Sequence, residues 1–118
     1  MIYWIRTSTP VWPKKAPMDF AIRYTRMINE KVPGATAEFC RRMTGNIEQV
    51  MFIVKFESLT EAEKFHETFA GIDEVQALMK ESVEVEEARG TPLWKDTEDH
   101  YYYVTEPRDH PPTNPYGR

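Results

Sequence analysis

The sequence predicts an α+β domain whose elements follow one another as strand, helix, strand, strand, helix and strand, and three observations support this order. Residues 35–56 form two strand-like runs joined by a Thr-Gly-Asn turn at residues 44–46, the pattern of an antiparallel hairpin. Apolar residues recur at helical spacing both before and after this hairpin. Residues 2–7 and 100–105 are rich in β-branched or aromatic side chains, as strands usually are.

The first helix is predicted to follow the first strand after a proline-rich loop. Pro17 suits the first helical position, where a missing N–H needs no partner. Pro33 and Gly34 end the helix, because proline cannot continue it and glycine readily adopts the left-handed conformation. The apolar stripe between these limits consists of Phe20, Tyr24, Met27, Ile28 and Val32.

The second strand of the hairpin, residues 47–56, differs between its two faces. Alternate side chains of a strand point to opposite sides of the sheet. One face is wholly apolar and the other is mixed, so we expect both faces to be covered. The apolar face carries Val50, Phe52, Val54 and Phe56, and the mixed face carries Gln49, Met51, Ile53 and Lys55.

The second helix is predicted to begin directly after the hairpin. Ser58 and Glu61 have the spacing of a capping box, in which each side chain bonds the backbone N–H of the other residue. Gly71 interrupts the helix, and a further helical stretch begins near Asp73. The apolar stripe of the first part is Leu59, Ala62, Phe65, His66 and Phe69.

The end of the chain is less regular. Residues 83–88 fit either the end of a helix or the start of a strand. A loop over residues 90–99 leads to the last strand at residues 100–105. We expect a single domain over residues 1–106, and a proline-rich C-terminal arm over residues 107–118, which hold four of the nine prolines.

The predicted order is the ferredoxin-like βαββαβ plan, a four-stranded antiparallel sheet with its helices on one face. The other face would then carry apolar residues such as Trp4, Met51 and Ile53 without a helix to cover them. An apolar face of this kind marks an interface, and pairing with a second copy of the chain would bury it. We therefore expect a homodimer formed through the open sheet face.

Composition excludes several classes of protein. A chain of 118 residues with net charge −4 and scattered basic residues argues against sequence-independent nucleic-acid binding. No apolar run approaches the length of about 20 residues that a membrane span requires. The single cysteine, Cys40, rules out an internal disulfide and fits a reducing compartment. These features predict a cytoplasmic protein with neither nucleic-acid nor membrane partners.

The pattern of elements over residues 1–106 resembles the dimeric α/β-barrel superfamily. This superfamily includes stress-responsive barrel domains, antibiotic-biosynthesis monooxygenases, haem-degrading monooxygenases and NIPSNAP proteins. The sharpest local match is Phe56-Glu57-Ser58 running into an amphipathic helix with aromatic residues in its second turn. The resemblance implies two protomers packed sheet to sheet, with a small ligand between each sheet and its own helices.

The resemblance does not extend to haem degradation. That branch pairs a strand Asn with a Trp and a His on the second helical segment, whereas here Phe65 and His66 occupy the Trp-like place and no His follows. We therefore expect no cofactor. The cyclase-like branch uses a His with a Tyr, and here His66 supplies the first type and Tyr24, Tyr3 or Tyr103 the second.

His66 and Tyr24 are the candidate catalytic residues. The imidazole group titrates near neutral pH, so His66 could act as a general base. The alternative is a half-buried histidine whose ring nitrogens bond a backbone group or a tyrosine. Arg41 and its neighbour Arg42 alternate to opposite faces of the hairpin. The alternatives for them are an anionic ligand, a structural ion pair, which Glu38 could form with Arg42, and a solvated strand end. The predicted ligand-binding residues are Tyr3, Phe39, Arg41, Phe52, Phe65 and Tyr103.

No metal site is predicted. Asp96, Glu98, Asp99 and His100 supply ligand types, but their spacing is not that of a known metal motif, and a solvated acidic loop is the simpler interpretation.

Three functional hypotheses remain open. The first is binding of a small hydrophobic or aromatic metabolite in a sheet–helix cleft. The second is a cofactor-independent monooxygenase or cyclase that acts on a polyketide-like aromatic substrate, with His66 as the base. The third is a non-catalytic assembly module that acts only by pairing. A cleft filled by Phe65 and Phe69 would favour the third hypothesis.

Overall fold

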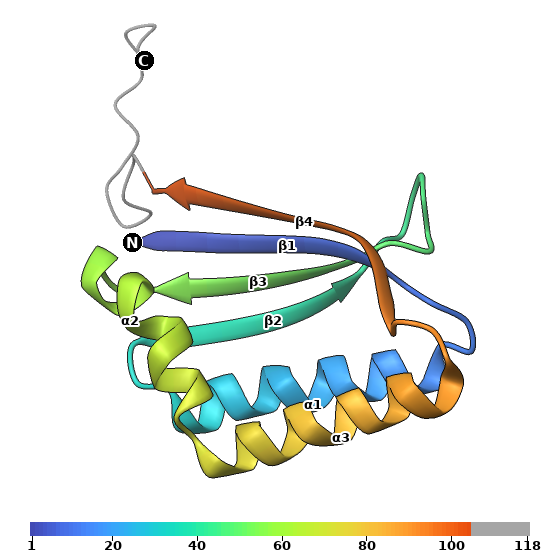
Figure 1. The fold of residues 1–118 in the computed structure, drawn as a ribbon. Helices are drawn as coiled ribbons and strands as arrows, with labels where there is room; N and C mark the ends of the chain where they lie inside the picture. The colour runs from blue at the N-terminus through green and yellow to red at the C-terminus, as the bar shows by residue number, and fades with distance from the viewer. Residues whose placement is uncertain (105–118) are drawn as a thin grey trace, which may run out of the picture.

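The computed structural model describes residues 1–104, which form a four-stranded sheet with three helices on one of its faces (Figure 1). Helices α1 and α3 lie side by side beneath the sheet, and α2 lies near the end where β1 begins (Figure 1). The predicted C-terminal arm lies outside the described residues. The elements are β1 (Ile2–Pro10), α1 (Lys15–Lys31), β2 (Ala35–Arg41), β3 (Val50–Phe56), α2 (Leu59–Ala70), α3 (Asp73–Arg89) and β4 (Trp94–Tyr103).

The strands lie in the order β2-β3-β1-β4, and every neighbouring pair is antiparallel. This order is that of the ferredoxin-like fold, so the predicted fold class is confirmed. The core lies between the sheet and the helices, where Phe56, Val75 and Leu78 are almost fully buried. None of the helices within residues 1–104 combines the length and the apolar character needed to cross a membrane.

The register of β1 against β3 assigns each side chain to a face. Met51 pairs with Thr7 and Ile53 pairs with Ile5, and both lie on the face without helices, as predicted. Trp4 pairs with Val54, which is buried beneath the helices. The prediction that Trp4 lies on the open face is therefore wrong: it is 9% exposed and packs against the helices.

The connection between β2 and β3 is longer than the predicted Thr-Gly-Asn turn. Arg41 and Val50 form the last pair of the two strands, and residues 42–49 form the loop between them. The side chain of Arg42 holds this loop together. Its Nε donates to the carbonyl of Thr44 at 2.8 Å, and its NH1 donates to Oε1 of Gln49 at 2.9 Å. The predicted pairing of Arg42 with Glu38 is not formed.

The helix signals are largely confirmed. Ser58 caps α2 by accepting the N–H of Glu61 at 3.2 Å, and a break near Gly71 separates α2 from α3. Residues 83–88 belong to α3, so the helical alternative is correct. Helix α3 ends where Gly90 takes the left-handed conformation with φ of 74°.

Strand β4 begins earlier than predicted. Residues 94–99 belong to the predicted loop, yet Trp94, Lys95, Glu98 and Asp99 pair with β1. A bulge between Thr7 and Thr9 accommodates the pairing, and the Ser8 and Thr97 hydroxyls are 2.7 Å apart. Because β4 is an edge strand with one side open to solvent, its polar residues cost little.

Candidate functional site

A cleft of about 400 Å³ lies between the sheet and the three helices. We call it the sheet–helix cleft. Strands β1, β3 and β4 form its floor and the helices form its walls. Most of its lining is apolar, chiefly Trp4, Phe20, Ile28, Phe52, Val54, Phe65, Phe69, Met79, Leu93 and Trp94. The polar lining residues are Arg6, Ser8, Tyr24, His66, Ser82, Glu86 and Thr97.

Four of the predicted site residues line this cleft: Tyr24, Phe52, Phe65 and His66. They come from α1, β3 and α2, and the fold brings them together because all four project into the space between sheet and helices. Phe39 does not line the cleft, but its ring packs against that of Phe52 with centroids 4.9 Å apart.

The other three predicted site residues lie elsewhere. Tyr3 pairs with Lys55 on the open face, so the expectation that Tyr3 lines the cleft is wrong: it lies one residue away from the helix-facing Trp4. Arg41 is an exposed residue at the end of β2 and does not reach the cleft. Tyr103 faces the helices but lies beyond the end of the cleft.

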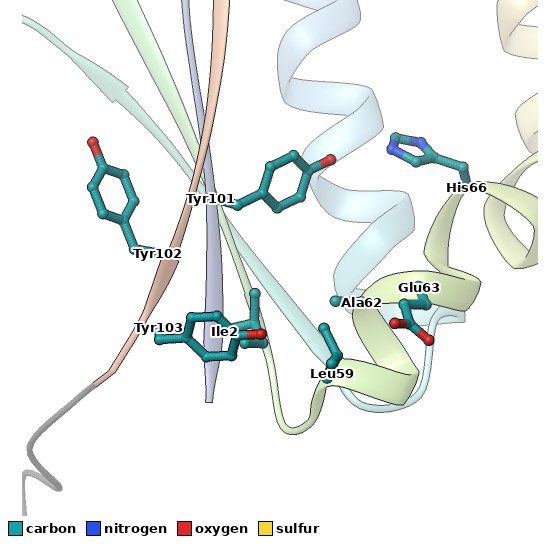
Figure 2. A pocket seen from close by; sticks show the side chains of 8 residues that line it. All are labelled: Ile2, Leu59, Ala62, Glu63, His66, Tyr101, Tyr102 and Tyr103. Carbon is teal, nitrogen blue, oxygen red and sulfur yellow. The ribbon is translucent and has the colours of Figure 1, made fainter.

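Tyr103 instead lines a second cavity of about 350 Å³, which we call the outer cavity (Figure 2). Figure 2 shows the rings of Tyr101 and His66 directed toward one another from β4 and α2, while Tyr102 points away. His66 lines both cavities and therefore lies where they meet. The remaining lining residues are Ile2, Leu59, Ala62 and Glu63.

Trp4 is the centre of the aromatic contacts around His66. Its ring lies 5.2 Å from that of His66 and 5.7 Å from that of Phe65, both edge to face, and it stacks on Tyr101 at 6.2 Å. Such contacts hold the rings in defined orientations. The sequence prediction missed Trp4 as a cleft residue because it placed this side chain on the open face.

The indole of Trp4 is also fixed by a polar contact, since its Nε1 donates to Oδ1 of Asp99 at 3.1 Å. Arg6 binds the same carboxylate through both oxygens, at 2.7 and 2.9 Å. The hydrogen bonds from Arg6 lower the pKa of Asp99 below its usual value, and the bond to Asp99 raises the pKa of Arg6. Both groups stay charged and neutralise one another. Arg6 and Asp99 were missed because residues 94–99 were predicted as a loop.

Three further polar residues line the cleft from α1 and α3, namely Tyr24, Ser82 and Glu86. Burial raises the pKa of Tyr24 above its usual value of 10.0, so its hydroxyl is protonated at neutral pH and can donate a hydrogen bond. Glu86 accepts the N–H of Leu93 at 2.9 Å through Oε2. Ser82 lines the cleft one helical turn before Glu86. Ser82 and Glu86 were missed because the acidic end of α3 has the composition of a solvated segment.

The acidic residues of β4 do not form a metal centre. Asp99 is engaged by Arg6, and Glu98 and His100 lie on the open face, 3.6 Å apart. Across residues 1–104 no group of three or more His, Cys, Asp or Glu side chains could hold a metal ion.

No family model and no curated protein matches this chain. Solved structures do match. A candidate antibiotic-biosynthesis monooxygenase from Deinococcus radiodurans has a TM-score of 0.63 at 8% identity, covering 95% of this chain and 100% of its own. SnoaB, a cofactor-independent oxygenase from Streptomyces nogalater solved as a point mutant, has a TM-score of 0.62 at 10% identity, covering 92% and 97%.

An uncharacterised NIPSNAP domain protein from Burkholderia xenovorans has a TM-score of 0.61 at 15% identity, with 95% of this chain and 100% of that chain covered. Identities this low establish the fold and no more. The neighbours belong to two of the groups that the sequence pattern resembles. The chain therefore has the ferredoxin-like fold shared by antibiotic-biosynthesis monooxygenases and NIPSNAP proteins, and the predicted resemblance is confirmed at that level without a specific member.

Proposed function

We propose that the protein binds a small, largely apolar aromatic molecule in the sheet–helix cleft. The observation that carries this proposal is the open space itself: about 400 Å³ remains although Phe65 and Phe69 project into it. Small-molecule sites usually have volumes of roughly 300–1,000 Å³ and apolar walls with a few placed polar groups. A filled cleft would have favoured a pure assembly module, so the open cleft favours ligand binding.

A binding experiment with a matched pair of variants tests this proposal. The neutral aromatic probe 3-methylindole should raise the melting temperature of the protein, because a ligand that binds only the folded state stabilises it. Met79→Trp places a larger side chain on the cleft wall and should remove the shift. Val83→Trp, an exposed position on the same helix outside the cleft, should keep it. Equal shifts in the two variants would place the probe somewhere else and overturn the proposal.

A second candidate function is a cofactor-independent oxygenase. It is favoured by the position of His66, which lines the cleft and contacts the ring of Trp4. In this reaction His66 would remove a proton from an activated methylene carbon of an aromatic substrate, and the resulting carbanion would react with O₂. SnoaB, which has a similar fold, is a cofactor-independent oxygenase.

Anthrone is a suitable test substrate because its methylene group is a carbon acid and its oxidation by one O₂ gives anthraquinone and water. Oxygen uptake should fall at least about a hundredfold in His66→Ala, the usual range for loss of a general base. His100→Ala, on the open face, is the matched control and should retain the rate. Uptake that is no faster than in buffer, or that survives in His66→Ala, would exclude the oxygenase candidate while leaving the binding proposal intact.

For the open sheet face we propose pairing with a second copy of the chain. Its centre, on β1 and β3, is apolar and consists of Tyr3, Ile5, Met51 and Ile53, whereas Glu38 and Lys55 form an ion pair toward the β2 edge. An apolar centre with a polar rim is the usual anatomy of an interface.

Light scattering after size exclusion tests this pairing. The protein should run as a dimer. Ile53→Asp should run as a monomer, because pairing would bury an unpaired negative charge at the centre of the interface. Ile47→Asp, in the exposed loop between β2 and β3, should remain a dimer. A monomeric parent protein at micromolar concentration would refute the pairing.

A further inference from the structure

The charged groups that face the sheet–helix cleft are not equivalent. Arg6 is the one arginine that lines it in the described part of the chain, and both oxygens of Asp99 bind its guanidinium at 2.7 and 2.9 Å. Its positive charge is therefore already compensated within the wall. A ligand carboxylate that approached Arg6 would also meet the charge of Asp99, so this end of the cleft favours a neutral ligand group.

Glu86 presents the opposite situation. Its Oε2 accepts the N–H of Leu93, and within residues 1–104 no lysine, arginine or histidine lies within salt-bridge distance of its carboxylate. Glu86 is partly buried and close enough to the Tyr24 hydroxyl to help raise the pKa of that group. Arg89, one turn further along α3, donates to the carbonyl of Val11 at 2.8 Å instead of pairing with Glu86. A partly buried carboxylate with no cation at salt-bridge distance stabilises a positive charge placed beside it.

The surroundings of Glu86 suit an organic cation. Leu93, whose N–H Glu86 accepts, precedes Trp94. Trp94 packs against the buried cluster of Phe20, Leu78 and Leu93, and its ring centroid lies 5.8 Å from that of Phe52. Aromatic rings attract ammonium groups through their negative faces. The carboxylate and the aromatic rings at this end of the cleft therefore both favour a positively charged ligand group.

We propose that the ligand of the sheet–helix cleft is an aromatic amine, with its ammonium group on Glu86 and its ring among the aromatic side chains of the wall. This inference rests on the proposed binding function and adds the charge of the ligand to it. It also predicts that aromatic carboxylic acids of the same size bind poorly.

Three indole probes of similar size separate the charge preference from binding itself. Calorimetry at pH 7 would compare tryptamine, which is cationic, with neutral 3-methylindole and anionic indole-3-acetate. We expect tryptamine to bind about tenfold more tightly than 3-methylindole, the size of effect expected for one hydrogen bond to a charged group. Indole-3-acetate should bind more weakly than either.

Variants assign the preference to its source. Glu86→Gln keeps an oxygen that can accept the N–H of Leu93 but removes the charge, so the ratio of tryptamine to 3-methylindole affinity should fall to about one. Glu87→Gln removes an equal charge from an exposed neighbouring position and should keep the ratio near tenfold. Asp99→Asn releases Arg6 from its counter-ion while retaining an acceptor for Trp4, and should improve binding of indole-3-acetate.

The outcomes distinguish the two proposals. Binding of 3-methylindole without any gain for tryptamine, or a gain that survives in Glu86→Gln, overturns the inference and leaves the binding function standing. If none of the three probes binds, the proposed binding function fails, and the inference fails with it.

Discussion

Phe65 and Phe56 offer a direct test of the open cleft, because they are buried phenylalanines in contact with each other and only one of them lines it. Both are buried, at 3% and 1% exposure, and their rings contact each other edge to face with centroids 5.1 Å apart. Phe65 also lines the cleft, whereas Phe56 does not. Truncation should therefore have different consequences at the two positions.

A buried Phe→Ala change costs about 3–5 kcal/mol, and the cost rises with the volume of the void that remains. Phe56→Ala should leave an enclosed void and cost about 4–5 kcal/mol, near the upper limit. Phe65→Ala removes the contacts with Trp4 and Phe69, but the space it creates only widens an existing cleft that water can enter. Phe65→Ala should therefore cost about 3 kcal/mol, at the lower limit.

Urea unfolding of both variants and the parent protein, at one protein concentration, measures this difference. The slope of free energy against urea should be the same in all three proteins, so that the midpoints report stability alone. A cost for Phe65→Ala that equals or exceeds that of Phe56→Ala would mean that the space beside Phe65 is closed in solution. That result would refute the reasoning and weaken the proposed function with it.

Three further changes test the local energetics. Ser58→Ala should cost about 1 kcal/mol in urea unfolding because the N–H of Glu61 loses its acceptor, and Ser58→Asp should restore it. Gly90→Ala should cost about 1 kcal/mol, since φ of 74° is unfavourable for alanine, although no atom beyond the neighbouring residues lies within 4 Å of the added carbon. An unchanged urea midpoint would contradict this. Asp99→Asn should cost at most about 1 kcal/mol at neutral pH, because the pair with Arg6 is well exposed. Because the pKa of Asp99 is lowered, the carboxylate contributes fully to stability above its usual pKa of 3.8 and loses this contribution as the pH falls through the lowered pKa. The urea midpoints of variant and parent should therefore converge as the pH is taken below 3.8.

Local signals predicted the fold well because the elements that carry them form within a few residues. The cap at Ser58 and the left-handed Gly34 after α1 depend only on near neighbours, and both are present. The apolar stripe of the first helix likewise predicted the buried residues Phe20 and Ile28. Local chemistry is enough for such features because the bonded groups are close in sequence.

The sequence of β1 could not show which of its side chains point to the helices. Ile2, Tyr3, Trp4 and Ile5 are all apolar, so the strand has no alternation of polar and apolar residues to distinguish its two faces. Only the register against β3 decides it, by pairing Trp4 with buried Val54. A shift of one residue would exchange the faces, and this is the error that placed Tyr3 in the cleft and Trp4 outside it.

The charge of the cleft depends on pairing in the same way. Arg6 and Asp99 are 93 residues apart, and they meet because β4 pairs with β1 in a register that puts both side chains on the helix-facing side. A slip of one residue that brought His100 opposite Arg6 would turn Asp99 to the open face and leave Arg6 without a carboxylate. The cleft would then hold an uncompensated guanidinium and would favour anions. The preference for a cationic ligand that we infer from Glu86 therefore also depends on the register of β4 against β1. For this reason the sequence pattern could indicate a cleft but not the charge of its ligand.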